Sequence, residues 1–302
     1  MLENIEFIIP CGGKSTRNYP QSKGIGHKCL LPFGDARLID YVLAQIFAVG
    51  GRHITIVCSD EATIHSFKEA LKPAPDVLEK LENKGLTKIA SALKKVTIPE
   101  DADIKYTVQA KPLGTAHVLG LAHRISENRH GLMIFPDDIY VNKDEMQSHL
   151  KKLVDEFLKD EKQILIMGIE REDVSNNSII EMGRLIEKPK NPSNNIGGFS
   201  PMVFPKACLD FIASHVKGLE NGSFKPTLLG NEWVYTDGVN MFLDTYPNDG
   251  YTLKMFKKDE DATYMDTGAL PFYERALLYS LLNHSVFKEE NREAVKEFLE
   301  KN

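Results

Sequence analysis

The feature that most constrains the fold is a loop rich in glycine and lysine that directly follows the first apolar run of the chain. Residues 5–9 have the apolar character of a buried strand. The chain then turns at Pro10 and at the pair Gly12-Gly13, where the lack of a Cβ lets backbone N–H groups approach an anion closely. The pattern therefore predicts a phosphate-binding loop after a first strand. The cations of this loop are Lys14, Arg17, Lys23 and Lys28.

The loop does not match two common phosphate motifs. Lys14 lacks the GxxxxGKS/T frame of a P-loop, and Ser15 stands where the dinucleotide motif GxGxxG has its second glycine. Glycine turns after strands are also common without any ligand. On this stretch alone, an ordinary structural turn is an equal alternative to a phosphate site.

Composition and charge exclude several classes of protein. The chain has 302 residues, of which 42% are hydrophobic and 26% charged, and its net charge is −6. These values are typical of a globular protein, and the acidic balance argues against a general nucleic-acid binder. No apolar run approaches the ~18 residues of a membrane span, and the chain does not begin with a basic and apolar leader. We therefore expect a cytoplasmic protein without a membrane segment.

The cysteines show no pattern of a metal site. Cys11, Cys29, Cys58 and Cys208 form no CxxC pair and no other metal spacing. We expect them to be reduced and mostly buried thiols, which fits a cytoplasmic protein.

Apolar runs and helical periodicities alternate through the first part of the chain. This alternation predicts an α/β fold, a Rossmann-like mixed and mostly parallel sheet with helices on both faces. Residues 76–95 are polar and helix-favouring, and we interpret them as an insertion outside the sheet. Strands are expected at residues 54–58, 104–109, 132–135 and 164–169, and helices at 38–49, at 62–71, from about 114, and over the pattern from Met146 to Leu158.

The second half has a different character, with strands joined by turns rich in proline and asparagine. No repeat and no low-complexity linker is found, so we expect residues 1–302 to form a single domain. Strands are expected at residues 178–185, 198–204 and 251–256, and helices at 232–243, 268–282 and 289–301.

Two acidic positions are candidates for a Mg²⁺ site. Asp137 and Asp138 follow the expected strand 132–135, and ligands gather at the carboxyl ends of strands in open α/β sheets. Asp266 precedes Gly268 in a similar setting and offers a second carboxylate. Mg²⁺ prefers such hard oxygen ligands. The alternatives are a plain Pro-Asp-Asp turn and a helix-capping Asp-Thr-Gly turn.

Two further segments suggest recognition of a sugar phosphate and of a base. Glu187 and Lys188 precede Pro189, which ends a strand, and they offer an acceptor for hydroxyl groups and a cation for a phosphate. The alternative is a solvated charged turn. Gln109 has an amide that suits the edge of a nucleobase, and Gly114 would let that base lie close to the backbone. His117 fits better as a structural helix residue.

In series, these segments resemble the sugar-phosphate nucleotidylyltransferases, with the closest likeness to the bacterial UTP–glucose-1-phosphate uridylyltransferases. The matches occur in family order and cover nearly the whole chain. The family's GGxGTR, PKxxLP, QxxPLGxxHAV, PD, EKPK, strand glycine, ExxxTD and late DxG motifs are matched at residues 12–17, 27–32, 109–118, 136–137, 187–190, 198–199, 232–237 and 266–273.

The resemblance implies a fold of the nucleotide-diphospho-sugar transferase type. It implies a nucleotide-binding half at about residues 1–140, a sugar-binding half at about 141–285 and a C-terminal helix at about 286–302. It also implies residue roles. Catalysis falls to Arg17, Lys28 and Asp137; nucleotide binding to Gly12, Gly13, Lys14, Gln109 and Gly114; sugar-phosphate binding to Glu187, Lys188, Gly198 and Glu232; and Mg²⁺ binding to Asp137 and Asp266.

The implied reaction is attack of a sugar-1-phosphate oxygen on the α-phosphorus of a nucleoside triphosphate, with release of pyrophosphate. UTP and glucose-1-phosphate are the first choice of substrates. Other pairs with dTTP, CTP or GTP, and a non-catalytic nucleotide-sugar sensor, stay as alternatives. A glycosyltransferase would commonly show a DxD motif, which Asp137-Asp138 lacks. We expect small-molecule partners only, with no nucleic acid or membrane, and leave a homo-oligomer open.

Three departures from the family pattern stand out. Ser15 replaces a loop glycine, His27 replaces the proline before Lys28, and the usual Tyr-Gly element is missing around Ser178. The first two leave activity expected. The third makes the identity of the sugar the weakest part of the prediction.

Overall fold

A computed structural model describes residues 2–301 except residues 127, 143–147, 228 and 259, so Met146 of the expected helix pattern lies outside the described residues. The first part of the chain contains β1 (Ile5–Cys11), β2 (Pro32–Phe33), β3 (Ala36–Arg37), α1 (Leu38–Ala48), β4 (His53–Cys58), α2 (Glu61–Ala70), α3 (Pro75–Asn83), α4 (Thr87–Lys95), β5 (Asp103–Val108), α5 (Thr115–His123), β6 (His130–Met133) and β7 (Asp138–Asn142). The second part contains α6 (Ser148–Phe157), β8 (Gln163–Glu170), β9 (Ser178–Glu181), β10 (Arg184–Glu187), β11 (Ile196–Phe204), α7 (Lys206–Asn221), α8 (Tyr235–Thr245), β12 (Thr252–Lys257), β13 (Ala262–Asp266), α9 (Leu270–Asn283) and α10 (Lys288–Lys301).

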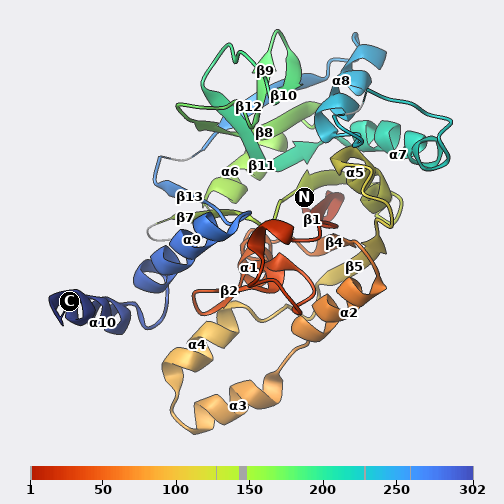
Figure 1. Cartoon of the computed structure of the whole chain (residues 1–302). Helices are drawn as coiled ribbons and strands as arrows, with labels where there is room; N and C mark the ends of the chain where they lie inside the picture. The colour runs from red at the N-terminus through yellow and green to blue at the C-terminus, as the bar shows by residue number, and fades with distance from the viewer. Residues whose placement is uncertain (1, 127, 143–147, 228, 259, 302) are drawn as a thin grey trace.

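Nine of the described strands form a mixed sheet with the order β10-β9-β11-β6-β1-β4-β5, in which β8 lies between β11 and β12, and β2 pairs only with β3 (Figure 1). Strands β5, β4, β1 and β6 run parallel, and β11 is antiparallel to β6 and to β8. Parallel strands need crossover connections, which α1, α2 and α5 supply here. The predicted α/β fold with a mixed sheet and helices on both faces is confirmed.

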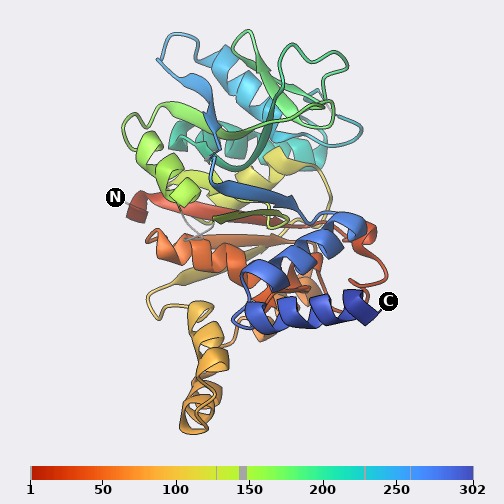
Figure 2. The ribbon, with the colours of Figure 1, turned by 90° about the vertical axis from the view of Figure 1, so that its left-hand side faces the viewer.

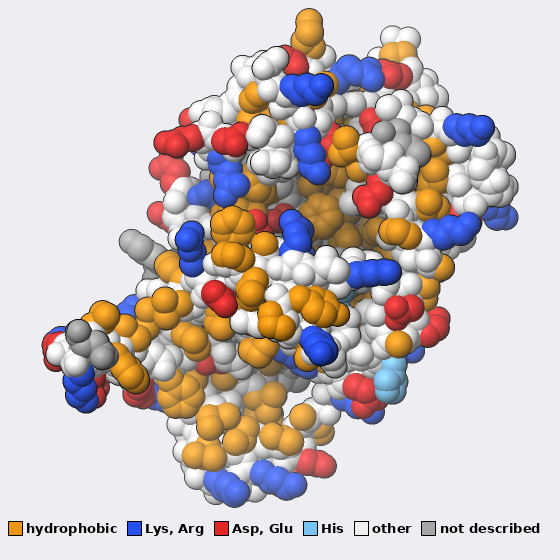
Figure 3. Space-filling view, viewed as in Figure 1, with side chains coloured by type: hydrophobic (Ala, Val, Ile, Leu, Met, Phe, Trp, Pro, Cys, Tyr) orange, Lys and Arg blue, Asp and Glu red, His pale blue; other side chains and the backbone are white. Residues whose placement is uncertain are grey.

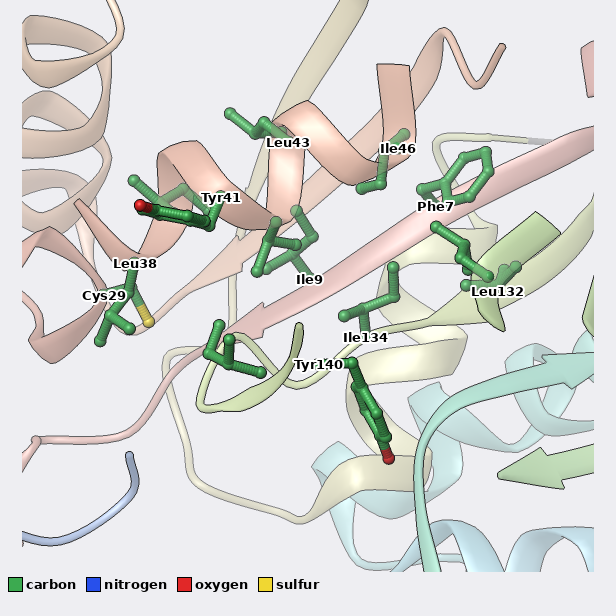
Figure 4. Packing of buried hydrophobic residues seen from close by; sticks show 14 of the residues in the cluster. Phe7, Ile9, Cys29, Leu38, Tyr41, Leu43, Ile46, Leu132, Ile134 and Tyr140 are labelled. Atoms are coloured by element: carbon green, nitrogen blue, oxygen red, sulfur yellow. The ribbon is translucent and has the colours of Figure 1, made fainter. Parts of the chain in front are cut away.

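The strand β1 shows why the sheet is covered on both faces. Successive side chains of a strand point to opposite faces. Ile5, Phe7 and Ile9 belong to one buried cluster, whereas Ile8 belongs to the cluster on the other face. Figure 4 shows Phe7 and Ile9 facing α1. Both faces of the strand are therefore apolar apart from Glu6, which is buried and accepts a hydrogen bond from Thr55.

The insertion at residues 76–95 consists of two helices, α3 and α4, with Gly85 at φ +68° between them. Figure 2 shows the pair projecting away from the body of the molecule. Of the residues in these two helices, only Ala90 is buried. The expectation that this polar segment lies outside the sheet is confirmed.

Three parts of the second half differ from the expected pattern. Residues 178–185 are not one strand but fall in the hairpin of β9 and β10, which turns at Met182 and Gly183, both with positive φ. The helix expected from residue 232 begins at Tyr235, because the backbone of Trp233 is held against Leu113 and Ala116. Helix α7 was not expected at all.

The strands β7 and β13 form a separate antiparallel ribbon that was also not expected. Its register places Asp266 opposite Asp138, although the two residues are 128 positions apart in the sequence. The ribbon joins the end of the parallel part of the sheet to the last third of the chain. No helix of the described residues is long and apolar enough to cross a membrane.

Candidate active site

The loop after β1 folds back on itself through Ser15. This residue adopts the left-handed conformation, with φ 54°. Its Oγ accepts a hydrogen bond from the backbone N–H of Lys28 at 2.9 Å, and its carbonyl accepts one from Ser22 Oγ at 3.0 Å. A glycine would adopt this conformation more easily, but it could not make the bond to Lys28. The first departure from the family pattern therefore ties the start of the loop to Lys28.

His27 has a local role of its own. Its Nδ1 accepts the backbone N–H of Cys29 at 3.2 Å and so caps the 3₁₀ turn η3 (Lys28–Leu30). Lys28 then projects to Asp137 and forms an ion pair with it. Burial would lower the pKa of Lys28, but the adjacent Asp137 carboxylate outweighs this and raises it. Lys28 is therefore held charged at the end of the strand.

The junction between β5 and α5 is built around a close contact of two backbone segments. Gly114 has φ +102°, and a Cβ at this position would lie 2.3 Å from the carbonyl oxygen of Trp233. That oxygen accepts the N–H of Ala116 at 3.0 Å, and the N–H of Trp233 donates to Leu113 at 2.8 Å. Only glycine fits such a contact.

Gln109 is held in place by this junction. Its Nε2 donates to the carbonyl of Gly114 at 3.0 Å and lies 3.2 Å from Nδ1 of His117. His117 is buried on α5, and its Nε2 lies 3.1 Å from Glu220. A Cβ on Gly12 would approach Gln109 Oε1 to 2.8 Å, so the glycine loop and the glutamine amide are direct neighbours.

The two carboxylates that were expected to share an ion are brought together at Gly268. A Cβ built on this glycine would lie 2.7 Å from Asp137 Oδ2, 3.0 Å from Asp266 Oδ1 and 3.5 Å from Arg17 Nη2. The carboxylate oxygens therefore converge on one point, and the cause is the register of β7 and β13. Two hard oxygen donors in this arrangement fit a Mg²⁺ ion, which takes few protein ligands at ~2.1 Å.

Asp138 has a different role from its neighbour. Its carboxylate accepts hydrogen bonds from Ser200 N at 3.0 Å, Ser200 Oγ at 2.8 Å and Tyr264 OH at 2.8 Å. Burial, with the charge of Asp137 beside it, raises the pKa of Asp138 to about 7. These contacts engage both of its oxygens, so Asp138 anchors the ribbon and Asp137 remains the ligand candidate.

The predicted sugar-phosphate residues meet where β10 and β11 approach α8. Lys188 has φ +46°, an uncommon conformation for a side chain of this kind, and its N–H donates to the carbonyl of Asn177 at 3.0 Å. Burial raises the pKa of Glu187. A Cβ on Gly198 would approach Ser178 Oγ to 2.4 Å, and that oxygen lies 2.7 Å from Tyr235 OH.

Two connected cavities gather most of the predicted residues. We call them the loop cavity, of about 360 Å³, and the strand-end cavity, of about 440 Å³. Figure 3 shows a hollow in this face of the molecule, with charged side chains around it. The loop cavity is lined by Gly12, Gly13, Lys28, Gln109 and Gly114, the strand-end cavity by Glu187, Lys188, Gly198 and Asp266, and both by Arg17, Thr115, Phe135, Asp137 and Glu232.

With this geometry established, comparison with known proteins decides the family. Residues 7–235, more than half of the chain, match the sequence profile of the nucleotidyl transferases. The chain belongs to the nucleotidyl transferase family.

Curated relatives of this nucleotidyl transferase are distant. A UTP–glucose-1-phosphate uridylyltransferase of Salmonella typhimurium is 25% identical over 207 residues, which are 67% of this chain and 65% of that protein. One of Klebsiella pneumoniae is 28% identical over 141 residues, 46% of this chain and 45% of that protein. The chain thus spans less than two thirds of the length of these relatives.

Solved structures match over a longer stretch. UDP-glucose pyrophosphorylase from Acinetobacter baumannii is 19% identical, with a TM-score of 0.75, and the match covers 97% of this chain and 99% of that chain. A UTP-bound structure of the enzyme from the same organism is 20% identical, with a TM-score of 0.73, over 97% and 98% of the two chains. At this identity the likeness shows the fold.

Not every predicted residue of this nucleotidyl transferase joins the site. Lys14 is exposed and does not line either cavity or a third one of about 700 Å³ next to α9. Sequence reasoning also missed several lining residues, which come from the segment before β9 and from β9, β11, α8, β13 and α9. Those of the strand-end cavity are Asn176, Asn177, Ser178, Phe199, Tyr235 and Tyr264, and those of the third cavity include Arg171 and Arg275.

Proposed function

We propose that this nucleotidyl transferase forms UDP-glucose and pyrophosphate from UTP and glucose-1-phosphate, with Mg²⁺. One observation carries the proposal: the loop cavity and the strand-end cavity meet at Asp137, beside Arg17 and Glu232. A triphosphate in the first cavity and a sugar phosphate in the second would meet at that carboxylate. Asp137 and Asp266 would hold the ion, which would supply positive charge to the phosphate oxygens.

The reaction needs no protein nucleophile, because the oxygen of the sugar phosphate is itself the attacking group. Its main obstacle is electrostatic. A phosphomonoester carries about −1.5 to −2 charges near pH 7 and must approach a triphosphate of higher charge. Lys28 and Arg17 on the loop side and Lys188 on the sugar side would offset this repulsion and hold the two groups in line.

The choice of base rests on Gln109. Its Nε2 is already engaged by Gly114, whereas its Oε1 faces the glycine loop. An amide oxygen can accept the N3–H of uracil, and cytosine has no hydrogen at that position. The UTP-bound structure of the similar Acinetobacter enzyme supports the same choice.

The choice of sugar rests on the curated relatives, which are named for glucose-1-phosphate. The usual Tyr-Gly element is missing around Ser178, whose hydroxyl is hydrogen-bonded to Tyr235. A different sugar-1-phosphate, or another triphosphate such as dTTP, is the second candidate. Both substrates occur in the cytoplasm, and we propose that location.

The test is a panel of nucleoside triphosphates against sugar-1-phosphates, with pyrophosphate release as the readout. We expect the fastest turnover with UTP and glucose-1-phosphate, and only in the presence of Mg²⁺. Asp137→Asn serves as the inactive control. Equal turnover with dTTP, or a preference for GTP or CTP, would overturn the assignment of the base. Absence of pyrophosphate release with every pair would favour a nucleotide-sugar sensor.

A further inference from the structure

Three potential metal ligands lie together behind the glycine loop. The side-chain ligand atoms of Cys11, His27 and Cys29 all lie within 4.8 Å of one another, and all three residues are buried. Cys11 is the last residue of β1, while His27 and Cys29 flank Lys28 in the turn η3. Figure 4 shows Cys29 among apolar side chains that include Ile9 and Leu38. The reaction proposed above uses none of the three.

Their spacing in the sequence gave no sign of this cluster. Cys11 is brought to the other two because the loop returns to the end of β1, where Ser15 is bonded to Lys28. The other two cysteines are in different settings. Burial raises the pKa of Cys58 to about 12, and it also raises the pKa of Cys208, which packs among apolar residues of the opposite cluster.

The Cys29 thiol stands apart from these. Burial alone would raise its pKa, but hydrogen bonds with Cys11 and His27 and the nearby charges of His27 and Lys28 outweigh it and lower the pKa, whereas burial and the bond to Cys29 raise the pKa of Cys11. A thiolate is the form of cysteine that binds metals. A soft anionic ligand, a second sulfur and an imidazole are thus assembled at one point.

We propose that Cys11, His27 and Cys29 form a binding site for a single thiophilic divalent ion, for which Zn²⁺ is the model. Zn²⁺ takes cysteine sulfur and histidine nitrogen in a tetrahedral arrangement. Three protein ligands leave the fourth position to water. Of the three, His27 also lines the loop cavity. Binding displaces the proton of any ligand thiol that is still protonated.

This site differs in kind from the carboxylate pair. Asp137 and Asp266 offer hard oxygen donors, which Mg²⁺ prefers, whereas the cluster offers sulfur and nitrogen. The ion would also bridge the two ends of the loop, because Cys11 directly precedes Gly12 and Cys29 directly follows Lys28. Closing a loop in this way restricts the unfolded chain. Bound Zn²⁺ should therefore raise the melting temperature.

The experiment uses the full chain, reduced and freed of metal, with excess Mg²⁺ present to occupy the carboxylates. Zn²⁺ is added, unbound ion is removed on a desalting column, and the retained metal is counted. We expect one equivalent in the wild type. Cys11→Ser and Cys29→Ser should bind at least ~100-fold more weakly, since even loss of an outer partner of a metal ligand costs about 10–100-fold. Cys208→Ser is the matched control and should retain the ion.

A second readout requires no variant. Co²⁺ bound in place of Zn²⁺ should give the near-ultraviolet charge-transfer band of thiolate ligation in the wild type. Absence of that band, or of a retained equivalent of Zn²⁺, overturns the proposal. Equal Zn²⁺ retention in folded Cys11→Ser, Cys29→Ser and wild type also overturns it. Because activity is not measured, these outcomes are independent of the proposed nucleotidyl transfer.

Discussion

Gly114→Ala tests the close contact that positions Gln109. The new Cβ would lie 2.3, 2.7 and 2.7 Å from three backbone atoms of Trp233, distances that require one segment to move. With φ +102° and ψ 178°, residue 114 has a backbone conformation that only glycine adopts readily; it costs another residue about 1–3 kcal/mol, and overpacking against a fixed neighbour adds about 1–3 kcal/mol. We expect the free energy of unfolding to fall by about 2–6 kcal/mol, because hydrogen bonds hold Trp233 on both sides.

Two other glycines separate the terms of this estimate. Gly85 has φ +68°, but a Cβ added there would have no neighbouring atom within 4 Å. Gly85→Ala therefore measures the cost of a positive φ without a steric contact. Gly13 has neither a positive φ nor a neighbour within 4 Å, and Gly13→Ala should change stability by no more than about 0.5 kcal/mol. The assay is urea unfolding of all three variants and the wild type, followed by circular dichroism.

The contact also has a functional consequence, because the carbonyl of Gly114 accepts the bond from Gln109. Gly114→Ala should therefore raise the KM for UTP in the pyrophosphate assay. If Gly114→Ala destabilises no more than Gly85→Ala, the backbone of Trp233 yields without cost and the reasoning is refuted.

Substitutions at three further residues address the charged groups of the site. Arg17→Ala should lower kcat by roughly 10²–10⁴, which is the scale for a lost charge stabiliser. Arg17→Lys should recover only part of this rate, because an ammonium group lacks the planar fork of the guanidinium. If steady-state kinetics of Arg17→Ala show a normal kcat and a raised KM for UTP, Arg17 acts in ground-state binding alone. Asp266→Asn should raise the Mg²⁺ concentration needed for half-maximal rate by at least about tenfold, and an unchanged Mg²⁺ titration would separate Asp266 from the ion. Lys188→Gly should lower turnover but leave the melting temperature equal or higher, because the backbone at φ +46° suits glycine better than lysine. A drop in the melting temperature would contradict this.

Much of the site could be predicted because its chemistry is local in the sequence. The glycine turn, the Gln109 junction and Asp137 each follow an apolar run, and such runs form parallel strands whose carboxyl ends share one edge of the sheet. Gly114 could be predicted in the same way, because a glycine at the junction of a strand and a helix indicates a close approach to the backbone there. The division into nucleotide-binding and sugar-binding halves of one domain stays a prediction.

The features that were missed depend on contacts between distant segments. The pairing of Asp266 with Asp138 is a matter of register between two short strands, and neither strand has a clear apolar pattern. Helix α7 contains His215 and Gly218, which weaken its helical signal, but Cys208, Leu209 and Ile212 bury its inner face. The spacing of Cys11, His27 and Cys29 in the sequence matches no metal-binding motif, because the cluster forms only when the loop returns to the end of β1.

The ribbon of β7 and β13 has a consequence for the growing chain during translation. The parallel strands β5, β4, β1 and β6, the glycine loop and Asp137 all lie before residue 138, whereas Asp266 leaves the ribosome almost 130 residues later. A nascent chain can therefore bury its first core and present Asp137 while the partner carboxylate has not yet been made. Pairing of β13 with β7 is then the step that brings Asp266 to Asp137, and it follows the formation of the parallel strands.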